Sequence, residues 1–140
     1  MGALSSTIPV KVEAAPLTFF VAGIPVSKAR PRFMKNGHTW TPDSTTAWEF
    51  TIATYARQAM AKAQWRGPSD ACFALRADFH MPTGRRVDCD NLVKCVADAC
   101  NKLIWKDDSQ VADLRVKRFL RAKVPGVWVR ATIIEEPVAI

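Results

Sequence analysis

The feature that most restricts the fold is the alternation of side chains over 71–81, with one apolar face and one largely polar face. Because successive side chains of a strand point to opposite faces, this alternation predicts a strand with one buried and one exposed face. Such a strand must pair with neighbouring strands, and other elements must pack against its apolar face. The alternating positions are Phe73, Leu75, Ala77 and Phe79 on one face, and Arg76, Asp78 and His80 on the other.

The rest of the chain supplies these partners. Pro125-Gly126 predicts a hairpin between the last two strands. The order β-α-β-α-β-β predicts an α+β fold, a single domain with one mixed sheet and helices packed on a face. The other elements follow from spacing and turn signals: helices from near Ser44 to the Gly67-Pro68 break and over 91–104, and strands over 17–21, 113–122 and 127–134.

The length of 140 residues allows one domain with an adequate core but not two. We expect a flexible N-terminal arm over 1–16, one folded domain over 17–134 and a short C-terminal tail over 135–140. No apolar run approaches the ~20 residues of a membrane helix, and no secretory signal is visible. The four cysteines form no C-x-x-C pair, so a zinc site has little support. Without a secreted context, we expect reduced, packed thiols and a cytoplasmic protein.

The charge balance points to an acidic partner. Lys and Arg number 20 against 13 Asp and Glu, a net charge of +7. Nucleic acid is the leading partner, because phosphate contacts by cations release counterions. A lipid surface would suit the charge as well, but no basic amphipathic helix supports it. The candidate DNA-binding residues lie in two basic loops: Lys28, Arg30, Arg32 and Lys35 in the first, and Arg85 and Arg86 in the second.

Acidic residues gather in one part of this basic chain. Seven of the 13 lie between Asp78 and Asp113. Asp88 and Asp90 are two apart in an extended segment, so their side chains can leave on the same side. The following helix would carry Lys94 one turn further and return the chain to Asp107-Asp108, so that three carboxylates could converge.

Clustered carboxylates in a basic protein are costly without a cation between them, and hard oxygen ligands suit Mg²⁺, with Mn²⁺ as the alternative. Such an ion activates water for phosphodiester cleavage, and a nearby lysine stabilises the developing charge. Taken singly, each part has a plainer interpretation. An Asp-x-Asp is usually a loop or a helix cap, with Asp90 as a good N-cap here; Asp107-Asp108 is usually a solvated turn, and Lys94 a surface lysine.

Together these residues resemble one family. The run Asp88-Cys-Asp-Asn-Leu-Val-Lys94, then Asp98-Ala-Cys-Asn101 and Asp107-Asp108-Ser-Gln-Val111, is similar to the RusA family of Holliday junction resolvases, often carried by phages. The segment Gly23–Arg32, followed by Thr41-Pro42, also resembles the family, and the likeness extends over about 18–134. Cys89 departs from the pattern, since an aliphatic residue is usual there.

The resemblance implies a homodimeric, Mg²⁺-dependent endodeoxyribonuclease that cuts four-way DNA junctions with paired nicks in recombination, repair or phage DNA processing. It would work in a bacterial or phage-infected cytoplasm. By position, Asp88, Asp90 and Asp108 match the metal-binding carboxylates and Lys94 the catalytic lysine. Asp107 is a further possible ligand. Asp98 matches a structural position that could pair with Lys94 or Lys102.

The leading hypothesis is therefore a metal-dependent resolvase of branched DNA. A nuclease of flaps, forks or other branches is the nearest alternative. A basic DNA-binding protein without catalysis is a third, although bare carboxylates near phosphates would oppose binding.

Overall fold

The computed structural model describes residues 15–28, 32–33, 39–40 and 43–140, with the backbone alone at 32–33 and 39–40. The predicted arm over 1–16 falls outside this part except for its last two residues, and 135–140 contains no helix or strand. The elements are β1 (Leu17–Ala22), β2 (Arg32–Phe33), β3 (Thr39–Trp40), α1 (Asp43–Ala63), β4 (Cys72–His80), α2 (Cys89–Ala99), the 3₁₀ turn η2 (Asp108–Gln110), β5 (Val111–Phe119) and β6 (Gly126–Ile134).

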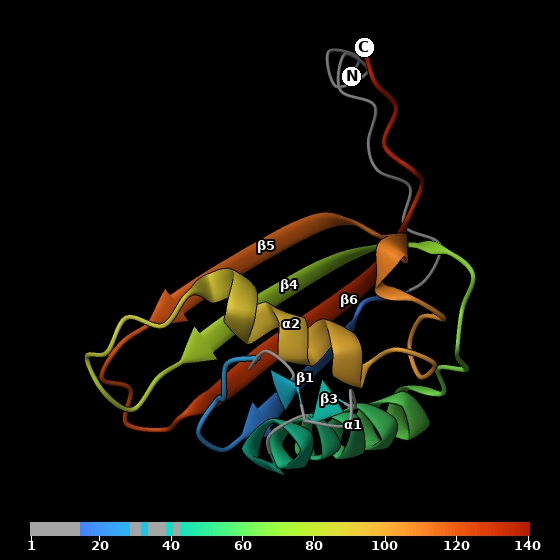
Figure 1. The fold of residues 1–140 in the computed structure, drawn as a ribbon. Helices are drawn as coiled ribbons and strands as arrows, with labels where there is room; N and C mark the ends of the chain where they lie inside the picture. The colour runs from blue at the N-terminus through green and yellow to red at the C-terminus, as the bar shows by residue number, and fades with distance from the viewer. Residues whose placement is uncertain (1–14, 29–31, 34–38, 41–42) are drawn as a thin grey trace.

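Four strands form one mixed sheet in the order β1-β6-β4-β5, and β2 pairs with β3 in a separate ribbon. β4 and β5 run parallel, as expected when a helix, here α2, crosses over between them. β6 is antiparallel to both β1 and β4. Figure 1 shows α2 lying across the sheet and α1 beside it. The predicted α+β class with a mixed sheet is confirmed.

One apolar core joins the sheet to both helices. The alternation that opened the sequence analysis is confirmed, since every second side chain of β4 from Phe73 to Phe79 is at most 1% exposed. Trp48 and Ile52 of α1 and Leu92 of α2 belong to the same buried cluster. The other face of β4 carries the polar side chains Arg76, Asp78 and His80. Of the helices in the described ranges, none is long and apolar enough to cross a membrane.

The predicted hairpin between the last two strands is wrong, because β4 lies between β5 and β6. The connecting segment 120–125 passes the end of β4, where the Ala122 N–H donates to the Met81 carbonyl at 2.8 Å. Gly126 is the first residue of β6, and a Cβ there would collide with the Val21 carbonyl of β1. The glycine therefore permits a close approach of two strands and is not a turn residue.

Two further boundaries differ from the prediction. The first basic loop contains the short strands β2 and β3, which have two residues each and leave almost no periodicity to detect. α2 ends at Ala99, five residues before the predicted end. The apolar pattern continues because Trp105 turns back into the core, where its Nε1–H donates to the Asn101 side chain at 3.1 Å and to the Ala97 carbonyl at 3.3 Å.

Candidate active site

Asp88 and Asp90 stand at the beginning of α2. Asp88 is the N-cap in an extended conformation (φ −63°, ψ 130°), and Asp90 lies in the first turn. The expectation that Asp90 is the N-cap is therefore wrong by two residues. Asp88 makes no side-chain capping hydrogen bond, and both carboxylates are exposed. The partial positive charge of a helix N-terminus favours these two anions.

The backbone around this pair is fixed from two sides. Arg118 of β5 donates through Nη1 to the carbonyl of Val87 at 2.6 Å, immediately before Asp88. The backbone N–H of Lys28 donates to the carbonyl of Asn91 at 2.8 Å, immediately after Asp90. The start of α2 is thus tied both to the sheet and to the segment that follows β1.

Lys94 lies between two carboxylates. Its Nζ is 3.0 Å from Asp108 Oδ2 and 3.1 Å from Asp98 Oδ1. The hydrogen bonds to Asp108 and then Asp98 raise the pKa of Lys94 above its usual value, against a smaller opposing effect of burial. Lys94 is therefore an ammonium at neutral pH. Of the two partners considered for Asp98, the structure selects Lys94.

The acidic pair Asp107-Asp108 divides into two roles. Asp107 caps η2: its carboxylate accepts from the Ser109 N–H at 2.9 Å, which lowers the pKa of Asp107. Gln110 completes the capping box by accepting from the Asp107 N–H at 3.0 Å, and its amide donates to two carbonyls before β4 at 2.7 and 2.8 Å. Asp107 therefore shapes the turn, and Asp108 faces Lys94.

Lys28 is an ion-pair partner in this structure. Its Nζ is 2.7 Å from Glu49 of α1 and 3.1 Å from Asp98 of α2. Burial lowers the pKa of Lys28, but the two carboxylates outweigh it, so the pKa is raised overall. The sequence analysis missed Glu49, because nothing in its helical surroundings marks a contact with a residue 21 positions earlier in the chain.

The second basic loop lies open beside the start of α2. Arg85 and Arg86 are exposed, as phosphate contacts require. Gly84 packs directly against the guanidinium of Arg121, so the segment 120–125 contributes a third arginine next to them. The predicted strand over 113–122 included Arg121, whereas β5 ends at Phe119 and leaves Arg121 in the connecting segment. Of the other candidate DNA-binding residues, Arg30 and Lys35 lie outside the described residues, as does the side chain of Arg32.

The donor set is suited to Mg²⁺ in its chemistry, because carboxylate oxygens are the ligands that this ion prefers. Over the described ranges, however, no group of three or more Asp, Glu, His or Cys side chains is gathered as it would be around a metal ion. Asp88 and Asp90 stand at the start of α2, while Asp108 is engaged by Lys94. Protein Mg²⁺ sites commonly use only one or two carboxylates together with water and substrate phosphates.

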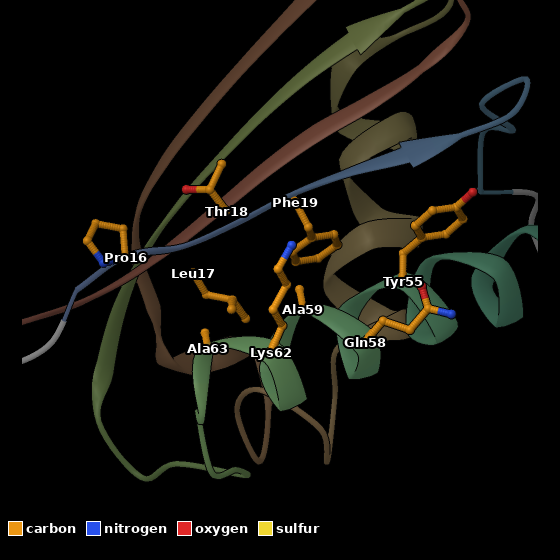
Figure 2. Close-up of a pocket in the computed structure, with 9 residues that line it drawn as sticks. All are labelled: Pro16, Leu17, Thr18, Phe19, Tyr55, Gln58, Ala59, Lys62 and Ala63. Atoms are coloured by element: carbon orange, nitrogen blue, oxygen red, sulfur yellow. The ribbon is translucent and has the colours of Figure 1, made fainter.

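The carboxylates lie apart from the hollow drawn in Figure 2. That cavity, of about 470 Å³, lies between β1 and α1 and is lined by residues such as Phe19, Tyr55 and Lys62. Of the candidate site residues that the structure describes, none lines it. The candidate active site is instead an accessible surface at α2 and η2, bordered by arginines.

The site combines two exposed carboxylates, an ion-paired lysine and neighbouring arginines on an α+β fold. This combination defines a candidate nuclease surface. The sequence pattern of the family Endodeoxyribonuclease RusA matches residues 22–132. The chain therefore belongs to the RusA endodeoxyribonuclease family, which confirms both the resemblance and the predicted enzyme class.

Individual relatives agree with this assignment. The crossover junction endodeoxyribonuclease RusA of Escherichia coli K12 is 34% identical over 96 residues, covering 68% of this chain and 77% of the relative. The uncharacterized protein YqaN of Bacillus subtilis 168 is 32% identical over 127 residues, covering 74% and 87%. A crossover junction endodeoxyribonuclease of Enterobacteria phage 82 is 51% identical over 46 residues, covering 32% and 38%.

Proposed function

We propose that this chain resolves four-way DNA junctions by Mg²⁺-dependent cleavage of two phosphodiester bonds. The observation that carries the proposal is the Lys94–Asp108 ion pair of 3.0 Å, which joins the end of the D-x-D-N-x-x-K run to the downstream acidic pair. Crossover junction endodeoxyribonucleases among the relatives support the choice of substrate.

Each part of the site has a chemical task in this proposal. Asp88 and Asp90 would hold Mg²⁺, joined by Asp108 once Lys94 releases it. The ion would supply an activated water and neutralise charge on the phosphate. Lys94 would then donate hydrogen bonds to the phosphate oxygen on which negative charge develops. Asp107 is a less suitable ligand, because its carboxylate is already used to cap η2.

The arginines would hold the substrate. Arg85, Arg86 and Arg121 lie on adjoining loops at the start of α2, where they can contact phosphates on either side of the cleaved bond. Such contacts fix the position of the DNA without reading its sequence. Their exposure makes binding strongly dependent on salt.

A homodimer completes the proposal. A four-way junction is two-fold symmetric and needs two cuts, whereas each chain carries one set of these residues. Sedimentation of the free protein and of its junction complex would give the stoichiometry, and we expect two chains per junction.

The test is cleavage of a synthetic four-way junction with Mg²⁺ and with EDTA, beside flaps, forks and linear duplex of the same sequences. We expect cleavage of the junction only with the metal, and none by Asp90→Asn. Preferred cleavage of flaps or forks would establish the broader branch nuclease instead. Tight binding without cleavage under any metal condition would establish a DNA-binding protein.

A further inference from the structure

Five charged side chains form one continuous series of ion pairs that runs into the candidate site. The series begins in α1 and ends in η2: Glu49 to Lys28 at 2.7 Å, Lys28 to Asp98 at 3.1 Å, Asp98 to Lys94 at 3.1 Å and Lys94 to Asp108 at 3.0 Å. The proposed function uses only the last two members. Glu49, Lys28 and Asp98 have no task in it so far.

Asp98 is the centre of the series, and it uses its two oxygens separately. Oδ1 accepts from Lys94, and Oδ2 accepts from Lys28. A carboxylate is planar, so a bond to one oxygen fixes the direction of the other. Lys28 therefore determines how Asp98 faces Lys94, although Lys28 and Lys94 do not touch.

Lys28 is itself well fixed. Glu49 holds its ammonium, and its backbone N–H is bonded to Asn91 of α2, one turn before Lys94. The side chains of Glu49, Lys28 and Asp98 are 21 to 24% exposed, whereas that of Lys94 is 51% exposed. A half-exposed lysine ordinarily moves among many rotamers, and a fixed carboxylate beneath it restricts that freedom.

We propose that Asp98 is a positioning residue for Lys94, and that the Lys28–Glu49 pair positions Asp98 in turn. The inference rests on the proposed function, which gives Lys94 its task at the phosphate. When Lys94 leaves Asp108 for the substrate, Asp98 keeps the ammonium in place. Lys28 therefore acts within the protein, as a partner of Asp98, and is not a phosphate contact.

The two roles of Lys28 predict different kinetics. A phosphate contact would contribute to junction affinity, as expected of the exposed Arg86. A positioning residue would leave affinity nearly unchanged and lower the rate of cleavage once the junction is bound. Small displacements of a reacting group, or loss of a supporting hydrogen bond, typically cost about 10-fold to 100-fold in rate.

The experiment measures junction Kd in Ca²⁺ and the single-turnover cleavage rate at saturating junction in Mg²⁺. For Lys28→Met and Asp98→Asn we expect a rate lowered about 10-fold or more with Kd within about twofold. The double variant should be no slower than the slower single one, because both changes act through the same contact. Arg86→Met should weaken Kd and keep the saturated rate, and Lys62→Met, a lysine at the end of α1, should change neither.

Circular dichroism melts establish that each variant is folded at the assay temperature, and Glu49→Gln offers a milder change if Lys28→Met is not. The inference is overturned if Lys28→Met weakens Kd as Arg86→Met does, or if it changes neither quantity. Failure of the proposed function looks different. In that case wild type does not cleave, or Lys94→Met cleaves at the wild-type rate, whatever Lys28→Met does.

Discussion

Replacing Lys94 by Met should tighten metal binding while it abolishes cleavage. The Lys94 ammonium is 3.0 Å from Asp108 Oδ2. A divalent ion that uses Asp108 must compete with this ammonium. Met keeps the unbranched shape of the side chain and removes the competing charge.

The distance and the exposure set the size of the effect. Two unit charges 3.0 Å apart attract by about 1.4 kcal/mol in a medium as polar as water. The two side chains are 51% and 27% exposed, so salt screening and lost rotamer freedom reduce the net value to roughly 1 kcal/mol or less. That value corresponds to at most about a fivefold change in affinity.

The assay is a titration of DNA-free protein with Mn²⁺, followed by calorimetry or by the electron paramagnetic resonance signal of free Mn²⁺. We expect Lys94→Met to bind roughly two to five times more tightly than wild type. Lys62→Met removes the same charge elsewhere and measures the general effect of net charge. If Lys94→Met binds Mn²⁺ no more tightly than Lys62→Met, Asp108 does not belong to the metal site.

Three further predictions concern Asp90, the η2 turn and the half-buried Lys28. Asp90→Asn should lower the cleavage rate by about 100-fold or more. The same variant should bind the junction in EDTA as well as wild type or better, because it removes an anion that faces the phosphate. Weaker binding in a gel shift would contradict this. Gln110→Ala should lower the free energy of unfolding, measured in urea, by roughly 2 to 3 kcal/mol, because it leaves two carbonyls before β4 without their donor. The control Ser109→Ala keeps the backbone N–H that Asp107 accepts and should change the free energy of unfolding little. Burial lowers the pKa of Lys28 less than Glu49 and Asp98 raise it, so its folded pKa lies above the usual 10.5. The stability that Lys28 contributes should therefore be complete below that pH and disappear as pH rises through the folded pKa; a difference between wild type and Lys28→Met that grows above pH 10.5 would be inconsistent with the ion pairs.

The local sequence pattern was sufficient to predict an element wherever burial of one face determines how that element packs. The alternation over Phe73–Phe79 identified the central strand, because a pleated strand buries every second side chain whatever its neighbours are. Asp98 is four residues after Lys94, so helical spacing alone makes their ion pair reasonable. The extended segment expected to hold both Asp88 and Asp90 is wrong at Asp90, which lies in the first turn of α2.

Strand order and contacts between residues far apart in the sequence could not be predicted from such local patterns. Pro125-Gly126 has the composition of a hairpin turn, but strand order depends on where α2 returns the chain, and β4 occupies the place beside β6. Glu49 of α1 and Lys28, which follows β1, are 21 residues apart and meet only in the folded chain, which no short motif records. Arg121 fell inside the predicted strand over 113–122, whereas β5 ends at Phe119 and Arg121 packs on Gly84.

Cleavage of a supercoiled plasmid with an extruded cruciform tests the central claim most directly. A resolvase cuts two strands at symmetric positions within one binding event, so the account predicts linear plasmid with paired nicks at the cruciform in Mg²⁺. Asp90→Asn should leave the plasmid supercoiled. Nicked circles without linear product, or cuts unrelated to the cruciform, would contradict the account.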